Sequence, residues 1–131
     1  MRRKDRVQQV AYSLGSADTL GSLASVVQES AHTAATPTLR ISILVEFIET
    51  HRDSVYRERA AMRVPWWKRN RVDSYAQGCV DAASATLAVL NLAPGQDEPG
   101  GDQVEVEHIL GYLHRKEERW RAIVSTGGVA T

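Results

Sequence analysis

Helical spacing of apolar residues is the feature that most constrains the fold of this chain. The stretch "EFIETHRDSVYRERAAM" (46–62) contains neither glycine nor proline. Residues 38–45, "TLRISILV", alternate apolar and polar residues as a strand does, so strand and helix are both possible there. We predict a single long helix that opens at Pro37, with Thr36 as its cap, and continues to residue 63. Its stripe is Leu44, Phe47, Ile48, His51, Val55 and Met62.

Four further helices are predicted from similar stripes. A short N-terminal helix ends at Gly15, because glycine commonly terminates helices. The next helix is capped by Ser16 or Asp18, and the last one opens with Asp102 and Glu105, a variant of the capping box. The stripes are Val7, Val10, Ala11 and Leu14; Leu20, Leu23, Ala24, Val27, Ala31 and Ala34; after Pro65, Val72, Ala76, Cys79, Ala83, Leu87 and Leu90; and Val106, Ile109, Leu110, Leu113, Trp120 and Val124.

These helices predict an all-α fold, a small antiparallel helical bundle of four main helices plus a short N-terminal helix. The length of 131 residues suits one domain. We predict a single helical domain over 1–124, with a flexible acidic loop at 93–102, "APGQDEPGGD", and a disordered C-terminal tail at 125–131. No internal repeat is apparent along the chain.

The composition predicts a cytoplasmic protein without a membrane span. Cys79 is the single cysteine, so no intramolecular disulfide can form, which fits a reducing compartment. No apolar run of the signal-peptide kind follows the basic N-terminus, and the weakly polar run 82–93 is too short to cross a bilayer. Thirteen arginines against three lysines are typical of a GC-rich genome, such as that of an actinobacterium or one of its phages, where a small accessory protein would fit.

The net charge is zero, but the two parts of the chain differ in sign. Residues 1–71 contain twelve Arg or Lys and seven Asp or Glu, whereas residues 72–131 contain four and nine. This asymmetry indicates complementary faces that meet within one fold or between copies. We expect the acidic part, including Glu105, Glu117 and Glu118, to be able to receive the basic part of a second copy.

Two Glu-x-x-His motifs are the candidates for a metal site. Carboxylate and imidazole one helical turn apart can share a metal ion, and two such motifs occur in bundles that bind two irons. In this chain, Glu29 and His32, and likewise Glu105 and His108, point away from the apolar stripes of their helices. We therefore predict that the protein binds no metal.

His51 and Cys79 are the candidates for catalysis. We interpret His51 as a core histidine that is hydrogen-bonded to a carbonyl or carboxylate, although a buried histidine can also titrate near neutral pH or bind a ligand. Cys79 lies among small residues, where a free cysteine usually behaves as a small buried hydrophobe. Because the sequence has no phosphate-binding loop and no nucleophile motif, we predict a protein that is not an enzyme and has no cofactor.

The strongest indication of a binding surface is the stretch "MRVPWWKRNR" (62–71). Two adjacent tryptophans on a helix project about 100° apart, so only one can cover the end of the bundle against Met62 and Tyr56. The other, Trp67, is expected to remain partly exposed beside cations, a composition typical of protein–protein hot spots. The predicted partner-binding residues are Arg59, Arg63, Trp66, Trp67, Lys68, Arg69 and Arg71.

The resulting hypothesis is a helical protein–protein interaction or assembly module that binds a protein partner or forms a homo-oligomer. The same stretch can also be only a structural corner between two helices, because aromatic residues dominate core burial. The alternative function is a nucleic-acid-binding regulator that uses the basic stretch 52–71, which contains seven Arg or Lys and two acids. Net neutrality counts against that alternative, and a helix-turn-helix template fails because Pro37 falls inside the would-be recognition helix.

Overall fold

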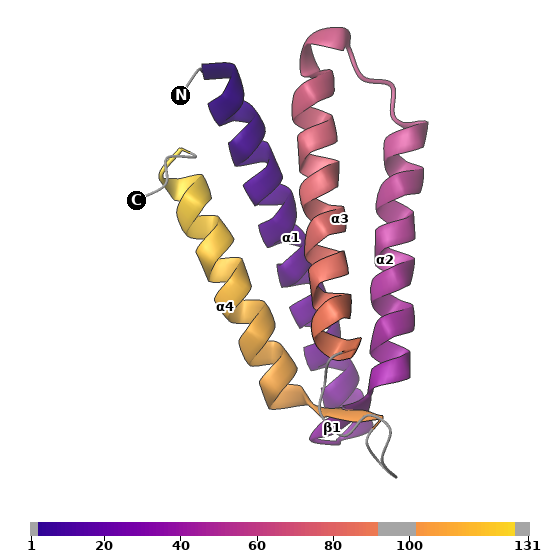
Figure 1. Ribbon diagram of the computed structural model, residues 1–131. Coiled ribbons are helices and arrows are strands. Elements are labelled where there is room, and N and C mark those ends of the chain that lie inside the picture. Colours follow the sequence, from indigo (N-terminus) through magenta and orange to yellow (C-terminus); the bar gives the residue numbers. More distant parts are fainter. Residues whose placement is uncertain (1–2, 92–101, 128–131) are drawn as a thin grey trace.

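The computed structural model describes residues 3–91 and 102–127 (Figure 1). Most of these residues are helical, which confirms the predicted all-α class. The elements in chain order are α1 (Arg3–Ala34), β1 (Thr38–Arg40), α2 (Ile41–Ala61), the 3-10 turn η1 (Trp66–Lys68), α3 (Arg69–Asn91), β2 (Gln103–Glu105) and α4 (Val106–Ser125).

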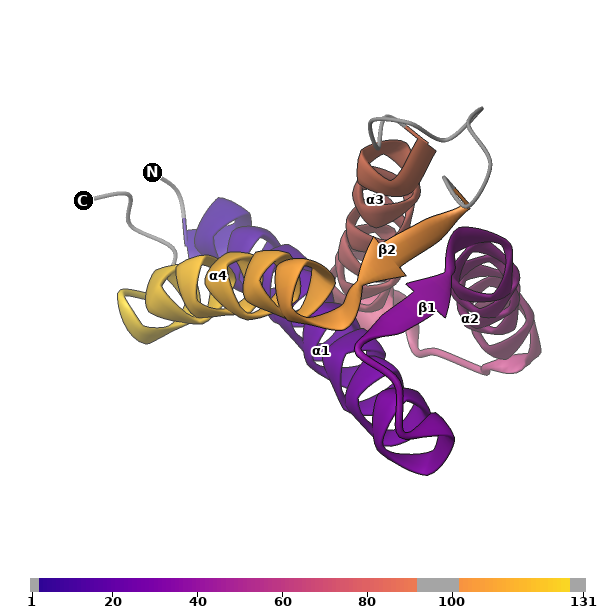
Figure 2. The same cartoon turned by 90° about the horizontal axis from the view of Figure 1, so that it is seen from below.

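The α1–α3 pair lies at the centre of the fold, with α4 packed along α1 and α2 packed along α3 (Figure 1). β1 and β2 form a two-stranded antiparallel ladder below the helices, with Leu39 opposite Val104 (Figure 2). We call this end of the molecule the strand end. The segment that joins α2 to α3 lies at the opposite end (Figure 1).

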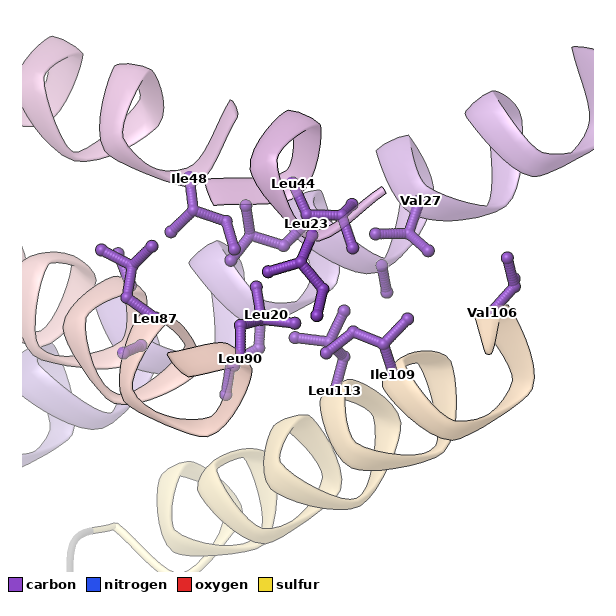
Figure 3. Close-up of a cluster of buried hydrophobic side chains, with 14 residues drawn as sticks. Leu20, Leu23, Val27, Leu44, Ile48, Leu87, Leu90, Val106, Ile109 and Leu113 are labelled. Atoms are coloured by element: carbon purple, nitrogen blue, oxygen red, sulfur yellow. The ribbon is translucent and has the colours of Figure 1, made fainter. Parts of the chain in front are cut away.

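The apolar core lies toward the strand end, and all four helices contribute to it (Figure 3). Each fully buried aliphatic side chain stabilises the fold by about 1.5–3 kcal/mol, so this cluster holds the helices together. Its labelled members are Leu20, Leu23 and Val27 of α1, Leu44 and Ile48 of α2, Leu87 and Leu90 of α3, and Val106, Ile109 and Leu113 of α4.

Gly15 does not end the first helix, contrary to the prediction, so the short N-terminal helix and the next one merge into the 32 residues of α1. The reason is tertiary, because Gly15 lies where α1 crosses α3. A Cβ atom at Gly15 would lie 2.1 Å from the Tyr75 carbonyl oxygen, and one at Gly78 would lie 2.1 Å from the Tyr12 carbonyl oxygen. Glycine at both positions allows the two backbones to touch.

The segment 38–45, for which strand and helix were both possible, contains both in the structure. Residues 38–40 form β1, so the prediction of helix from Pro37 is wrong there, and the helix prediction is confirmed from Ile41 onward. A three-residue strand needs a partner, and that partner, β2, lies more than 60 residues away in the chain. The spacing of apolar residues within one segment gives no information about such a distant partner.

The predicted caps of α2 and α4 are also wrong. The Pro37 carbonyl accepts a hydrogen bond from Val106 N–H (2.9 Å), and the Asp102 carbonyl accepts one from Ile41 N–H (2.6 Å). Pro37 and Asp102 therefore precede the strands instead of opening helices. Glu105 is the residue before α4 and makes no side-chain capping bond.

The predicted loop and tail fall mainly outside the described residues. Residues 93–101 of the acidic loop and 128–131 of the tail lie there, so the structure describes only Asp102 of the first and 125–127 of the second. Ser125 is the last residue of α4, and Gly127 follows in a turn in which its N–H donates to the Val124 carbonyl (3.0 Å).

An internal repeat relates two halves of the molecule, so the prediction of no repeat is wrong. Half one consists of α1, β1 and α2, and half two consists of α3, β2 and α4. The segments "YSLGSAD" (12–18) and "YAQGCVD" (75–81) share Tyr, Gly and Asp at the same spacing. The segments "LRISILVEFI" (39–48) and "VEVEHILGYL" (104–113) share most of their apolar positions.

The contacts between the two halves are reciprocal, as at a two-fold axis. The backbone hydrogen bonds at the two strands match, because Ile41 N–H donates to the Asp102 carbonyl and Val106 N–H donates to the Pro37 carbonyl. In the repeat, Ile41 is equivalent to Val106, and Pro37 is equivalent to Asp102. The α1–α3 crossing follows the same rule. Its matched hydrogen bonds are Tyr12 OH to Asp81 (2.6 Å) and Tyr75 OH to Asp18 (2.6 Å), and Ser16 Oγ to the Gly78 carbonyl (3.1 Å) and Cys79 Sγ to the Gly15 carbonyl (3.3 Å).

Candidate functional site

The connection between α2 and α3 forms a tight corner. After α2 ends at Ala61, the chain reaches Pro65, and Trp66–Lys68 make a single 3-10 turn that leads directly into α3. The Pro65 carbonyl accepts a hydrogen bond from Lys68 N–H (3.0 Å), and proline favours this entry because its ring restricts φ. We call residues 63–71 the Trp–Arg tip.

Both tryptophans of the Trp–Arg tip are exposed, Trp66 by 78% and Trp67 by 66%. Their rings meet edge to face with centroids 6.0 Å apart. The expectation that one indole covers the end of the bundle is wrong, because Met62 and Tyr56 are themselves more than half exposed. Burial of such a side chain is worth about 1.5–3 kcal/mol, which a partner surface can supply.

The cations around the Trp–Arg tip fall into two groups. Arg59 forms an ion pair with Asp73, which ties α2 to α3. The remaining cations are exposed and make no ion pair within residues 3–91 and 102–127, so their charges are available to a ligand. These are Arg63, Lys68, Arg69 and Arg71.

A cavity of about 190 Å³ opens beside the Trp–Arg tip, between α1, α2 and α3. His51 lines it and places Nε2 3.2 Å from Thr19 Oγ1, so His51 is hydrogen-bonded, but to a hydroxyl and at the wall of a cavity. Burial lowers the pKa of His51, and the nearby Glu58 carboxylate partly offsets this. On the opposite wall, burial and the bond to Asp18 raise the pKa of Tyr75.

Cys79 and the Glu-x-x-His motifs have surroundings unlike those of reactive sites. Cys79 is buried and donates to a backbone carbonyl, and burial raises the pKa of its thiol, which is therefore protonated at neutral pH. The four side chains of the Glu-x-x-His motifs are exposed, with Glu105 at the end of β2 and the other three on helices. Within the part of the chain that the structure describes, no three His, Cys, Asp or Glu side chains are grouped to hold a metal ion.

Sequence analysis missed the two Tyr–Asp bonds at the α1–α3 crossing. The apolar spacing indicates Asp18 only as a helix cap, and it pairs neither Tyr12 with Asp81 nor Tyr75 with Asp18. The signal was present, because Tyr-x-x-Gly-x-x-Asp starts at Tyr12 and again at Tyr75. The shared motif is visible when identical residues at equal spacing are compared, although the two segments have little contiguous similarity.

No protein-family model, curated protein or solved structure matches this chain. Among the described helices, none has the length and apolar character needed to cross a membrane. The candidate site is therefore defined by the geometry of the Trp–Arg tip and the adjacent cavity.

Proposed function

We propose that this protein is a non-enzymatic interaction module that docks on another protein through the Trp–Arg tip. The observation that carries the proposal is the exposure of two adjacent indoles, 78% and 66%, on a corner supported by two helices. Tryptophan and arginine are enriched at the centres of protein interfaces, because an indole buries a large apolar area and a guanidinium bonds a carboxylate in two places. The partner surface is therefore acidic and contains an apolar depression.

Nucleic acid is the second class of ligand for such a surface, and the local charge distribution favours protein. Binding of the phosphates requires cations that are clustered along the path of the nucleic-acid backbone. Asp73 already neutralises Arg59, and Glu58 lies at the neighbouring cavity, so acids interrupt the basic stretch 52–71. Four exposed cations without an ion pair in the described residues, Arg63, Lys68, Arg69 and Arg71, are gathered at one corner.

A second copy of the chain is an acidic partner that the charge distribution allows. Residues 54–73 contain six Arg or Lys and two acids, whereas 22–50 and 102–114, which include the strand end, contain one and six. Contact between the tip of one copy and the strand end of another is therefore attractive, while contact between two tips is repulsive. Sedimentation velocity at increasing protein concentration, in low and high salt, tests this head-to-tail association, which would give open chains or rings.

Selection from a displayed library of random peptides tests the docking proposal without a known partner. We expect the wild-type chain to enrich acidic peptides that also carry apolar residues. Binding of these peptides should weaken roughly 30-fold or more in the double variant Trp66→Ala/Trp67→Ala, because even one central interface tryptophan contributes about 2 kcal/mol or more. Equal enrichment of these peptides by the wild-type protein and by the double variant would contradict the proposal.

A single-stranded oligothymidine provides the opposing measurement. Protein docking through an indole weakens little with salt, whereas phosphate binding falls steeply as salt rises, because the release of condensed counterions into a more concentrated salt solution gains less entropy. Oligothymidine affinity that depends on Trp66 and Trp67, falls steeply with salt and exceeds peptide affinity would replace the proposal with the nucleic-acid alternative.

A further inference from the structure

The molecule has two cavities at positions that the repeat relates. The first, beside the Trp–Arg tip, opens between α1, α2 and α3, and the second, of about 290 Å³, occupies the equivalent place between α1, α3 and α4. Each cavity is lined by a tyrosine and an aspartate that are hydrogen-bonded to each other between α1 and α3. A basic side chain from the third helix, α2 or α4, also lines it. The corresponding residues are Asp18, Tyr75, His51 and Val55 at the first cavity, and Asp81, Tyr12, Lys116 and Trp120 at the second.

The two cavities differ in their aromatic content. At the second cavity, the Trp120 ring packs edge-on against Tyr12 with centroids 5.7 Å apart. At the first cavity, the matching residue is Val55, and Tyr75 has no aromatic ring contact among residues 3–91 and 102–127. The place beside Tyr75 therefore lacks the ring that the repeat supplies beside Tyr12.

The cavity beside Tyr75 has the size and lining to hold one aromatic ring. An apolar cavity of about 150 Å³ is known to bind benzene, and this one measures about 190 Å³. Val55, Met62 and Val72 supply apolar wall. The exposed carboxylate of Glu58 also lines it, has no ion-pair partner in the described part of the chain, and can accept a hydrogen bond from a ring N–H or O–H.

We infer that this cavity is a socket for a tryptophan or tyrosine side chain of the partner that docks on the Trp–Arg tip, so the inference rests on the proposed function. Met62 and Val72 flank residues 63–71 on either side and line the socket, which makes the socket and the tip neighbours. Charge complementarity identifies the source of the ring, because the unpaired cations of the tip attract an acidic segment. The partner is thus an acidic peptide segment that presents an aromatic side chain with a hydrogen-bond donor.

Nuclear magnetic resonance of the ¹⁵N-labelled chain, titrated with N-acetyl-tryptophanamide, tests the socket independently of the tip. We expect shifts around His51, Val55 and Tyr75, with a dissociation constant on the order of 1 mM because one ring gives little binding energy. Val55→Trp fills the socket with its own ring and should weaken binding at least roughly tenfold. Trp120→Val, the matched change in half two, is the control and should leave the probe-induced shifts around His51, Val55 and Tyr75 unchanged.

Several outcomes would overturn the socket. These are unchanged probe binding in Val55→Trp, or the absence of shifts near Tyr75 at probe concentrations of about 10 mM, ten times the expected dissociation constant. If Val55→Trp does not fold, Val55→Phe places a smaller ring at the same position and must show the same loss.

Two comparisons separate the socket from the docking proposal. The variant Trp66→Ala/Trp67→Ala should retain probe binding while it loses peptide binding, and loss of probe binding in it overturns the socket. An acidic peptide with one tryptophan should bind more tightly than the same peptide with alanine there, and equal affinity that still depends on the tip overturns the socket alone. Displacement of the probe by oligothymidine would assign the socket to a nucleobase and overturn the peptide assignment.

Discussion

The two halves of this protein share one frame although most of their residues differ. Glycine, tyrosine and aspartate recur at the α1–α3 crossing, and the apolar positions of β1 and α2 recur in β2 and α4. The differences lie elsewhere, since Trp66 and Trp67 stand where half one has Arg3 and Lys4, and Val55 stands where half two has Trp120. The shared positions make the fold, so the exposed positions that differ between the halves are available for binding.

Truncation of matched core residues gives the largest expected effect and tests whether the halves are energetically equivalent. Ile48 and Leu113 occupy equivalent places and are 4% and 1% exposed. We expect Ile48→Ala and Leu113→Ala each to lower the free energy of unfolding by about 2–5 kcal/mol, as lost burial adds to the cost of the cavity left behind. Urea denaturation followed by circular dichroism measures both, and a loss of less than about 1 kcal/mol in either would break the equivalence.

Alanine at the crossing glycines gives the next largest effect. Gly15→Ala and Gly78→Ala should each destabilise by about 1–3 kcal/mol, because either new methyl group would force the two backbones apart. The double variant should cost less than the sum of the two, since the first substitution already separates the helices.

Gly111→Ala is the matched control for the crossing glycines. Its new methyl group would meet only the movable Arg115 Nη1 at 3.1 Å. We expect it to stabilise α4 by about 0.5–1 kcal/mol, because alanine has the higher helix propensity. Similar losses in all three glycine variants would contradict the assignment of the crossing.

High pH tests the reciprocal Tyr–Asp bonds, with a smaller effect. Burial and the bond to Asp81 raise the pKa of Tyr12 to about 12, above the value of about 10 in an unfolded chain. The native state therefore holds this proton more tightly, so stability is complete below pH 10 and is lost as pH rises toward about 12.

The expected loss at high pH is about 1 kcal/mol after allowance for solvent screening. Tyr12→Phe should flatten this part of the stability profile. Ultraviolet titration of tyrosinate in the folded chain checks the cause directly. Ionisation of Tyr12 at the ordinary tyrosine pKa would show that its bond to Asp81 is absent in solution.

The smallest effect on stability is expected at the Trp–Arg tip. Trp66→Ala/Trp67→Ala should change the free energy of unfolding by no more than about 0.5 kcal/mol, because both rings are exposed. The same variant should lose peptide binding, which separates it from core variants that lose binding only by unfolding. A large loss of stability would instead identify the tip as a structural corner.

The periodicity of the chain predicted most helices because their apolar stripes are long and local. The prediction from periodicity was wrong where the local structure depends on a residue far away in the sequence. Gly15 is an example, because it packs near Gly78 of another helix. The same limit explains the strands, which exist only as a pair. Exposure of Trp67 was predicted, whereas that of Trp66 was not, because the number of rings that the bundle end can cover depends on how α2 and α3 diverge.

The sequence by itself determined that this protein is helical, which faces of its helices are apolar, and that its tryptophans lie beside cations, since each property follows from neighbours within a few turns. Only the tertiary structure decided that two halves pair reciprocally, that Asp18 meets Tyr75, and that a cavity remains where Val55 replaces a ring. These features depend on the distance of closest approach between helices. That distance is decided by glycine pairs and hydrogen bonds that join residues some 60 positions apart.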